Sequence, residues 1–182
     1  GRYAYVASSS GNSRTGVDVS RPNSPAIVGT LSDSTNLAGA RSVFVSGKYA
    51  YVAAGTNDRL TVVDVSNPST PVFTGSVSDS SRLASVRAVF VSGRYAYLTD
   101  NTNSRLTAVD VSNPSAPAVI GSLQDTTNLL NPRGLFVSGR YAYVTAPGNN
   151  RLSVVDISNP ASMQHLGHVN LTSDSSSRCR RC

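Results

Sequence analysis

The sequence contains no tryptophan and no glutamate, and it has a single lysine among its 182 residues. Lysine and glutamate usually fill the exposed face of a helix, so their scarcity argues against a helical protein. The sequence also has no run of 18 apolar residues of the kind that crosses a membrane as a helix. We therefore expect an all-β chain without membrane insertion.

Acidic residues are few, with 10 against 16 basic residues and a formal net charge of +6. Arg178, Arg180 and Arg181 supply half of this excess at the C-terminal end. The rest of the chain has no continuous basic stripe with interleaved aromatic residues, so we expect no nucleic-acid binding. The N-terminal sequence has neither an initiator methionine nor a signal-peptide pattern, which favours a soluble chain that is a processed product or a fragment.

Groups for catalysis are also scarce. General acid–base chemistry needs a pair of carboxylates or a histidine in separate environments, and here most of the aspartates recur at fixed spacing. The sequence has no glycine-rich phosphate loop and no nucleophile elbow. It therefore predicts a protein that is not an enzyme and that uses no cofactor.

The phrase Gly-Arg/Lys-Tyr-Ala-Tyr begins at Gly1, Gly47, Gly93 and Gly139, so four units follow one another at a spacing of 46 residues. A fixed period of this length indicates a repeat architecture. The units span residues 1–46, 47–92, 93–138 and 139–182. A chain of this size buries one core, so we predict a single domain over residues 1–182.

Each unit has the pattern of four short strands. In the second unit, hydrophobic runs over residues 49–53, 60–65, 72–77 and 89–92 predict these strands. Gly, Asn or Pro stands in the turns between them, where these residues fit the required φ. Four antiparallel strands in about 46 residues match one propeller blade, which must stack on neighbours to bury both faces. The fold class predicted is a β-propeller of four four-stranded blades, with a linear β-solenoid as the alternative.

The segments 60–64, 106–110 and 152–156, each followed by Val/Ile-Ser-Asn-Pro, resemble the LVIVD repeat. The upstream Tyr-Ala-Tyr-Val and Arg-x-Val/Leu-Phe-Val-Ser-Gly segments fit the same pattern, although the first unit departs from it at residues 15–18 and 21–22. The sequence is also similar to the YVTN repeats of surface-layer propellers. The resemblance covers nearly the whole chain and implies a propeller that is secreted or displayed on the cell surface.

The chain starts at the second strand of a blade, so a closed ring needs its C-terminal segment beside residues 3–6. Residues 177–182 stand in that register but lack the Val-Phe-Val core of the other innermost strands. Three states remain open: a closed four-blade monomer, an eight-blade ring of two chains, or an open piece of a larger propeller. An open edge would support oligomers or fibres.

Two recurring residue types have structural explanations. The eight tyrosines fall at two positions of the unit, i and i+2 on one strand, so both rings face the gap between blades and we expect them to pack there. An aspartate ends the third strand of each blade, at Asp18, Asp64, Asp110 and Asp156. We expect these carboxylates to accept backbone N–H bonds in the turns that follow.

A candidate binding site combines arginines and aspartates at one mouth of the central channel: Arg41, Arg87, Arg133, Asp33, Asp79 and Asp125. The arginines precede the innermost strands, and the aspartates lie in the loops that enter the same mouth. One interpretation pairs each arginine with a nearby carboxylate or carbonyl. The other is a surface that binds an acidic glycan or peptide, because guanidinium groups bind carboxylates in a bidentate manner.

Every histidine and cysteine lies in the last 18 residues, at His165, His168, Cys179 and Cys182. Together they have the count of a zinc site, although positions i and i+3 of a strand face opposite ways unless Gly167 bends it. A disulfide of Cys179 with Cys182 or with another chain is the expectation for an extracellular protein, and free thiols are the alternative. Asn170 begins an N-glycosylation sequon.

These features predict a non-enzymatic extracellular or cell-surface propeller scaffold. Its partner is expected to be protein, other copies of itself above all, with glycans as a further class, and its function to be assembly or adhesion as an oligomer or filament. The alternative is a ligand-binding or enzymatic propeller that recognises an acidic glycan or peptide at the channel mouth.

Overall fold

The computed structural model describes residues 2–171, which form four antiparallel β-sheets. The first sheet has three strands: β1 (Tyr3–Ser8), β2 (Ser13–Asp18) and β3 (Ala26–Ser32). The only helical segment of the described residues is the short 3₁₀ turn η1 (Pro147–Asn149). The prediction of an all-β chain is therefore confirmed.

The remaining three sheets have four strands each. The second sheet contains β4 (Ala40–Ser46), β5 (Tyr49–Ala54), β6 (Arg59–Asp64) and β7 (Val72–Ser78). The third contains β8 (Val86–Ser92), β9 (Tyr95–Asp100), β10 (Arg105–Asp110) and β11 (Ala118–Gln124). The fourth contains β12 (Gly134–Ser138), β13 (Tyr141–Ala146), β14 (Arg151–Asp156) and β15 (Gln164–Asn170).

The sheets are offset from the sequence units by one strand. β8, for example, ends the unit 47–92 but pairs with β9, so it is the innermost strand of the following sheet. In the first sheet β1 pairs with β2 alone among the described residues. The inner edge of β1 is therefore unpaired there.

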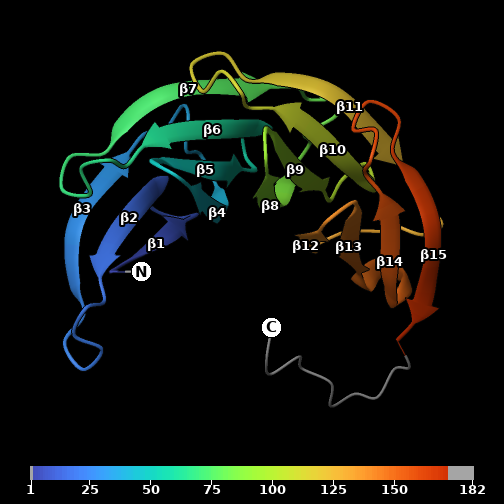
Figure 1. The fold of residues 1–182 in the computed structure, drawn as a ribbon, viewed down its shortest axis with the longest axis horizontal. Helices are drawn as coiled ribbons and strands as arrows, with labels where there is room; N and C mark the ends of the chain where they lie inside the picture. The colour runs from blue at the N-terminus through green and yellow to red at the C-terminus, as the bar shows by residue number, and fades with distance from the viewer. Residues whose placement is uncertain (1, 172–182) are drawn as a thin grey trace.

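The four sheets are the blades of a β-propeller and follow one another around an arc (Figure 1). The innermost strands β1, β4, β8 and β12 contact one another in that order on the concave side. The outermost strands β3, β7, β11 and β15 form the convex side, and the first and fourth sheets stand apart at the ends of the arc. The described residues thus form an open four-blade arc rather than a closed four-blade ring.

Tight hairpins join each inner strand to the next. Gly47, Gly93 and Gly139 have φ values of 58°, 59° and 56°, and each opens a two-residue turn. Glycine adopts this left-handed conformation without steric cost, which explains its recurrence at this position. The turn predicted at residues 46–48 is confirmed.

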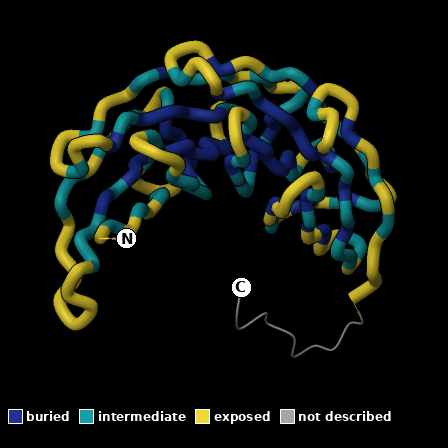
Figure 2. Tube along the Cα trace, in the orientation of Figure 1, coloured by how far each residue is buried: buried dark blue, intermediate teal, exposed yellow. Residues whose placement is uncertain are grey.

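The core lies between neighbouring sheets, as the buried band along the middle of the arc in Figure 2 indicates. Tyr51 of the second sheet packs among Leu98 and Val109 of the third, and Tyr97 packs against the fourth sheet in the same way. These two tyrosines are only 5% and 3% exposed, so the predicted packing of tyrosine between blades is confirmed for them. Tyr143, in the last sheet, is half-buried because no further sheet covers it.

Candidate functional site

The two ends of the arc expose apolar residues at positions that are buried inside it. Val6 of the first sheet is 51% exposed, whereas its equivalents Val52 and Leu98 are 0% exposed. We call the uncovered side of the first sheet the N-terminal end face. Its members are Ala4, Val6, Val17 and Val19, which are exposed or half-buried.

The uncovered side of the fourth sheet is the C-terminal end face. It consists of the half-buried Tyr143, Leu152 and Val154 together with the exposed Leu166 and Val169. Their equivalents in the third sheet, Tyr97, Leu106, Ala108, Ile120 and Leu123, all pack in the core between the third and fourth sheets. The repeat therefore places at this end a surface of the kind that packs on the next sheet, and no sheet of the described residues covers it.

The aromatic side chains of the inner strands show the same interruption. Phe44 and Phe90 have ring centroids 4.5 Å apart, and Phe90 and Phe136 follow at 5.5 Å. Phe136, at the end of this row, is 58% exposed. The row of stacked rings thus ends on an open aromatic surface beside the C-terminal end face.

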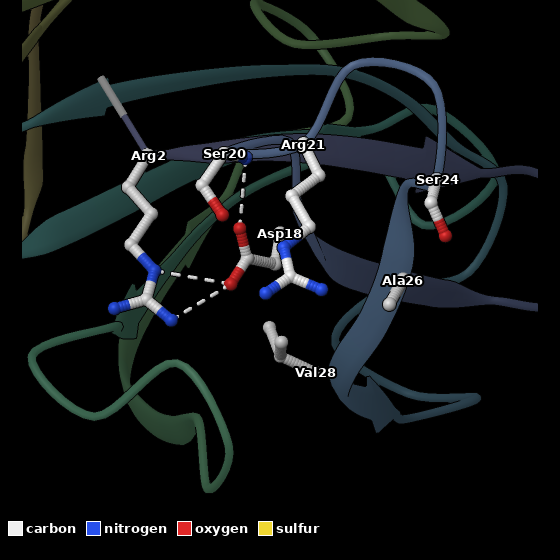
Figure 3. Close-up of a pocket in the computed structure, with 7 residues that line it drawn as sticks. All are labelled: Arg2, Asp18, Ser20, Arg21, Ser24, Ala26 and Val28. Carbon is white, nitrogen blue, oxygen red and sulfur yellow. Dashed lines mark hydrogen bonds and ion pairs between the residues drawn. The ribbon is translucent and has the colours of Figure 1, made fainter.

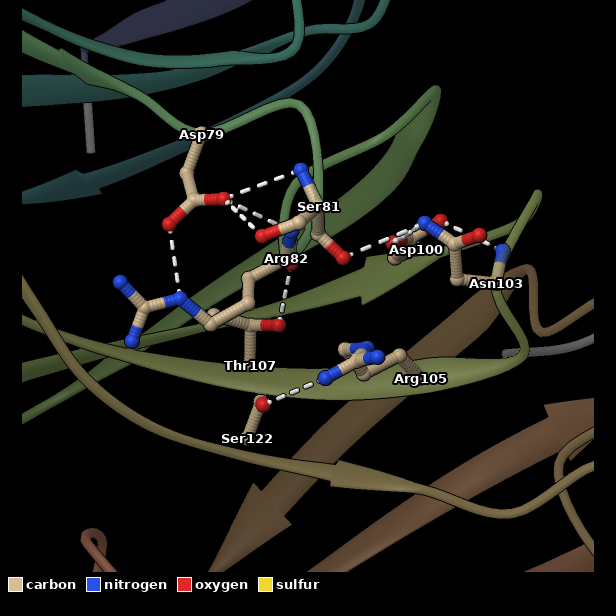
Figure 4. Close-up of polar contacts among 8 residues, drawn as sticks. All are labelled: Asp79, Ser81, Arg82, Asp100, Asn103, Arg105, Thr107 and Ser122. Atoms are coloured by element: carbon tan, nitrogen blue, oxygen red, sulfur yellow. Dashed lines mark hydrogen bonds and ion pairs between the residues drawn. The ribbon is translucent and has the colours of Figure 1, made fainter.

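The three aspartates of the predicted channel-mouth site are engaged within their own loops. One oxygen of Asp79 accepts the backbone N–H groups of Ser81 and Arg82 at 3.0 and 2.9 Å, and the other accepts from Arg82 Nε at 2.7 Å (Figure 4). The hydrogen bond from Ser81 leads the interactions that lower the pKa of Asp79 to about 2, against the opposing effect of burial. Asp33 and Asp125 make equivalent bonds to the residues two and three positions further on.

The arginines of that site are placed differently from one another. Arg41 donates from Nη1 to Ser85 Oγ at 2.7 Å, and burial, followed by the charge of Arg87, lowers its pKa. Arg87 is half-buried and Arg133 is exposed. Among residues 2–171, none of the three forms an ion pair with Asp33, Asp79 or Asp125. Arg41 therefore lies near Arg87, whereas the three aspartates form hydrogen bonds within their own loops.

The aspartates at the ends of β2, β6, β10 and β14 make the predicted turns. Asp110, for example, accepts the backbone N–H of Ser112 at 2.9 Å. Each also forms an ion pair with a basic residue that lies over a tyrosine ring, as Arg94 does at 5.3 Å from the centroid of Tyr95. This ion pair was not predicted from the sequence. The fixed spacing of the three residues in every unit was the available signal.

The two histidines of the predicted zinc site lie close together. A register shift between Val154 and Val155 bulges β15, and the rings of His165 and His168 have centroids 5.8 Å apart. The bulge supplies the bend that their sequence spacing requires. Within the described part of the chain, no three His, Cys, Asp or Glu side chains are grouped to hold a metal.

The other C-terminal predictions fall partly beyond the described residues. Cys179 and Cys182, and with them the disulfide and the remaining zinc ligands, lie outside residues 2–171. Asn170 is exposed and accepts a hydrogen bond from Arg151 Nε at 3.1 Å. The threonine that completes its glycosylation sequon also lies outside the described residues.

Two buried ionisable residues escaped the sequence analysis. Arg14 is 0% exposed in β2 and Asp100 is 0% exposed at the end of β9. Asp100 accepts the backbone N–H of Asn103 at 2.9 Å and its side-chain amide at 3.0 Å (Figure 4), while burial raises the pKa of its carboxyl. At both positions the other units have different residues. A comparison of the four units position by position would therefore have singled out Arg14 and Asp100.

Four-stranded sheets arranged blade by blade around an axis define a β-propeller protein. More specifically, the chain belongs to the LVIVD repeat family, whose model matches residues 1–33, 39–79, 84–125 and 132–171. These four matches coincide with the four sheets rather than with the sequence units. No curated protein matches the sequence.

Solved structures share the fold at low sequence identity. A protein from Lactobacillus plantarum has a TM-score of 0.77 at 14% identity, over 93% of this chain and 54% of its own. The periplasmic gluconolactonase of Pseudomonas aeruginosa has a TM-score of 0.75 at 15% identity, over 94% of this chain and 52% of its own. A functionally unknown protein from Desulfotomaculum acetoxidans has a TM-score of 0.72 at 12% identity, over 92% and 52%. The chain thus spans about half the length of the solved structures that it matches.

Residues 2–171 contain no helix with the length and apolar character that crossing a membrane requires.

Proposed function

We propose that this protein is a non-enzymatic extracellular scaffold whose two end faces mediate assembly, with a second copy of the same chain as the partner. The observation that carries the proposal is the exposure of Val6, Leu166 and Val169, at 51%, 55% and 53%, in positions that pack between sheets elsewhere in the arc. Exposed apolar surface of this kind, next to unpaired strand edges, is typical of interaction sites.

The two end faces are complementary, because each repeats one side of the interface that forms between neighbouring sheets inside the arc. The interface of the third and fourth sheets joins Leu106 and Ala108 to Ala142 and Val144. The same positions, one sheet further on, are Leu152 and Val154 on the C-terminal end face and Ala4 and Val6 on the N-terminal end face. The C-terminal end face of one copy therefore has the residue pattern to pack on the N-terminal end face of another. Two arcs joined in this way at both ends make an eight-blade ring with two-fold symmetry.

The native mass tests the proposal. We expect twice the 19.0 kDa chain mass for a closed ring, and higher multiples for a filament. Leu166→Asp, which places a charge on the C-terminal end face, should return the protein to the mass of one chain. Val72→Asp is the matched control, because Val72 is 60% exposed on the outer strand β7 of the second sheet, which lies inside the arc and contributes to neither end face. A wild-type mass of one chain at all concentrations would contradict self-assembly.

A second candidate function uses the channel mouth. It is favoured by the proximity of Arg41 and Arg87, where two partly buried guanidinium groups face no carboxylate among the described residues. Such a pair suits an acidic glycan or peptide. The triple variant Arg41→Glu, Arg87→Glu, Arg133→Glu should abolish binding of acidic glycans without changing the native mass. Absence of any glycan or peptide binding by the wild type would leave assembly as the function.

A further inference from the structure

A cavity of about 360 Å³ lies in the first sheet, beside the start of β1 and the end of β2 (Figure 3). Its lining combines charged, hydroxyl and apolar side chains from the residue before β1, from the end of β2, from the turn that follows β2 and from β3. The lining residues are Arg2, Asp18, Ser20, Arg21, Ser24, Ala26 and Val28.

The ion pair of Arg2 with Asp18 uses only two of the three nitrogen atoms of its guanidinium group. It donates from Nε and Nη2 to Asp18 Oδ2 at 3.0 and 2.9 Å, while Asp18 Oδ1 accepts the backbone N–H of Ser20. Nη1 of Arg2 has no hydrogen-bond partner within the described part of the chain. The equivalent ion pair recurs in the other three sheets, so by itself it is a structural feature of the repeat.

Arg21 distinguishes the first sheet from the others. The equivalent position holds Asn67, Asn113 and Asn159, whose side-chain oxygen accepts the backbone N–H two residues further on. In the first sheet the turn keeps its backbone bond, since Ser24 N–H donates to the carbonyl oxygen of Arg21 at 2.9 Å. The turn therefore forms without an asparagine, and the exposed Arg21 guanidinium makes no hydrogen bond to residues 2–171.

The cavity thus has two guanidinium groups and one carboxylate, an excess of one positive charge. We propose that it binds a small organic carboxylate through the guanidinium of Arg21, with the guanidinium of Arg2 adding positive charge. The planar guanidinium group matches the geometry of a carboxylate, and its positive charge strengthens the hydrogen bonds that it donates to the carboxylate oxygens. The hydroxyls of Ser20 and Ser24 offer further donors, and Ala26 and Val28 supply an apolar wall for a short aliphatic chain. This site is separate from the channel mouth and borders the N-terminal end face through the turn at residues 21–24.

A matched variant is provided by the repeat itself. Arg21→Asn installs the residue of the other three sheets, so the turn should form as it does there, and circular dichroism and thermal unfolding should match the wild type. Butyrate is the probe, butyramide the neutral control of equal shape, and inorganic phosphate the anion without an aliphatic chain. Binding is followed by NMR titration of the backbone amides of residues 18–28.

Butyrate should shift these amides in a saturable manner, butyramide should not, and Arg21→Asn should weaken butyrate binding at least tenfold. A tenfold loss corresponds to about 1.4 kcal/mol, close to the lower limit of what one hydrogen bond to a charged group contributes. Arg94→Asn, at an exposed arginine of the third sheet that lies in neither candidate site, should leave the affinity unchanged. Equal affinity of wild type and Arg21→Asn, equal shifts with butyramide, or tighter binding of phosphate than of butyrate would overturn the assignment.

Discussion

The guanidinium of Arg14 lies over the ring of Tyr5, 4.4 Å from its centroid, in the interior between the first and second sheets. The side chain is 0% exposed, and none of its three nitrogen atoms has a hydrogen-bond partner in the described residues. The tyrosine ring offers a cation–π contact, but such a contact does not replace the hydrogen bonds lost from water. Burial accordingly lowers the pKa of Arg14.

The other units place leucine at this position, at Leu60, Leu106 and Leu152. We predict that Arg14→Leu stabilises the fold by about 1–4 kcal/mol, because replacing a buried charge with a well-packed apolar side chain commonly has this effect. Urea unfolding monitored by circular dichroism measures the change. The reciprocal variant Leu60→Arg should destabilise the protein, since Leu60 is 0% exposed in the core. Lower stability of Arg14→Leu would mean that Arg14 has a partner of opposite charge.

Stability should also fall in acid. Asp18, Asp79, Asp110 and Asp156 have pKa values lowered to about 2 by hydrogen bonds and basic neighbours. Aspartate in the unfolded chain has a pKa of about 3.9, so the unfolded state takes up protons first as the pH falls. The stabilisation is complete above about pH 4 and is lost as the pH falls toward 2. Urea unfolding at pH 6, 4 and 2.5 measures it.

The matched variant for this prediction is Asp110→Asn, which removes one titrating group and its ion pair with Arg94. Its free energy of unfolding should depend less on pH between 4 and 2 than that of the wild type. Asp100 acts in the opposite sense, because burial raises the pKa of its carboxyl. Its contribution decreases stability as the pH rises above the unfolded value. A wild-type profile that is flat between pH 4 and 2.5 would contradict the assigned carboxylates.

Much of the fold follows from the repeat. The hairpins at Gly47 and Gly93, the turns after Asp64 and Asp110 and the packing of Tyr51 were predicted, because each depends on short-range chemistry that recurs in every unit. The pairing of each final strand with the following sheet also agrees with the predicted innermost strands. Fold and turns were therefore accessible from one sequence.

The candidate sites were less accessible, because they depend on departures from the repeat. Arg14, Arg21 and Asp100 each stand where the other units have a residue of another type. What each does depends on whether its polar atoms are buried and whether they have hydrogen-bond partners, and this is set by neighbouring side chains. Asp79 was assigned to a channel-mouth site, but its oxygens bind its own loop at distances that only coordinates give. The openness of the arc likewise depends on how far one sheet is rotated from the next, which the hydrophobic pattern does not encode.

A glycine that recurs in the outermost strands lies where one sheet contacts the next. A Cβ atom at Gly121 would lie 2.2 Å from the carbonyl oxygen of Pro160 in the next sheet, and Gly29 and Gly75 meet the following sheets in the same way. Such distances are too short for any real contact, so Gly121→Ala should separate the sheets and destabilise the fold by about 1–3 kcal/mol. Gly167 is the equivalent glycine of the fourth sheet, and a Cβ atom there meets nothing within 4 Å.

The pair Gly121→Ala and Gly167→Ala therefore separates folding from assembly. In a single chain Gly167→Ala should leave the unfolding midpoint unchanged, because the space beside it is open. In an assembly through the end faces, the turn at residues 21–24 of a second copy would lie against Gly167, as residues 67–70 lie against Gly29. Gly167→Ala should then lower the native mass to that of one chain at concentrations where the wild type is assembled. If Gly167→Ala left both mass and stability unchanged while the wild type was assembled, the copies would have to associate through surfaces other than the end faces.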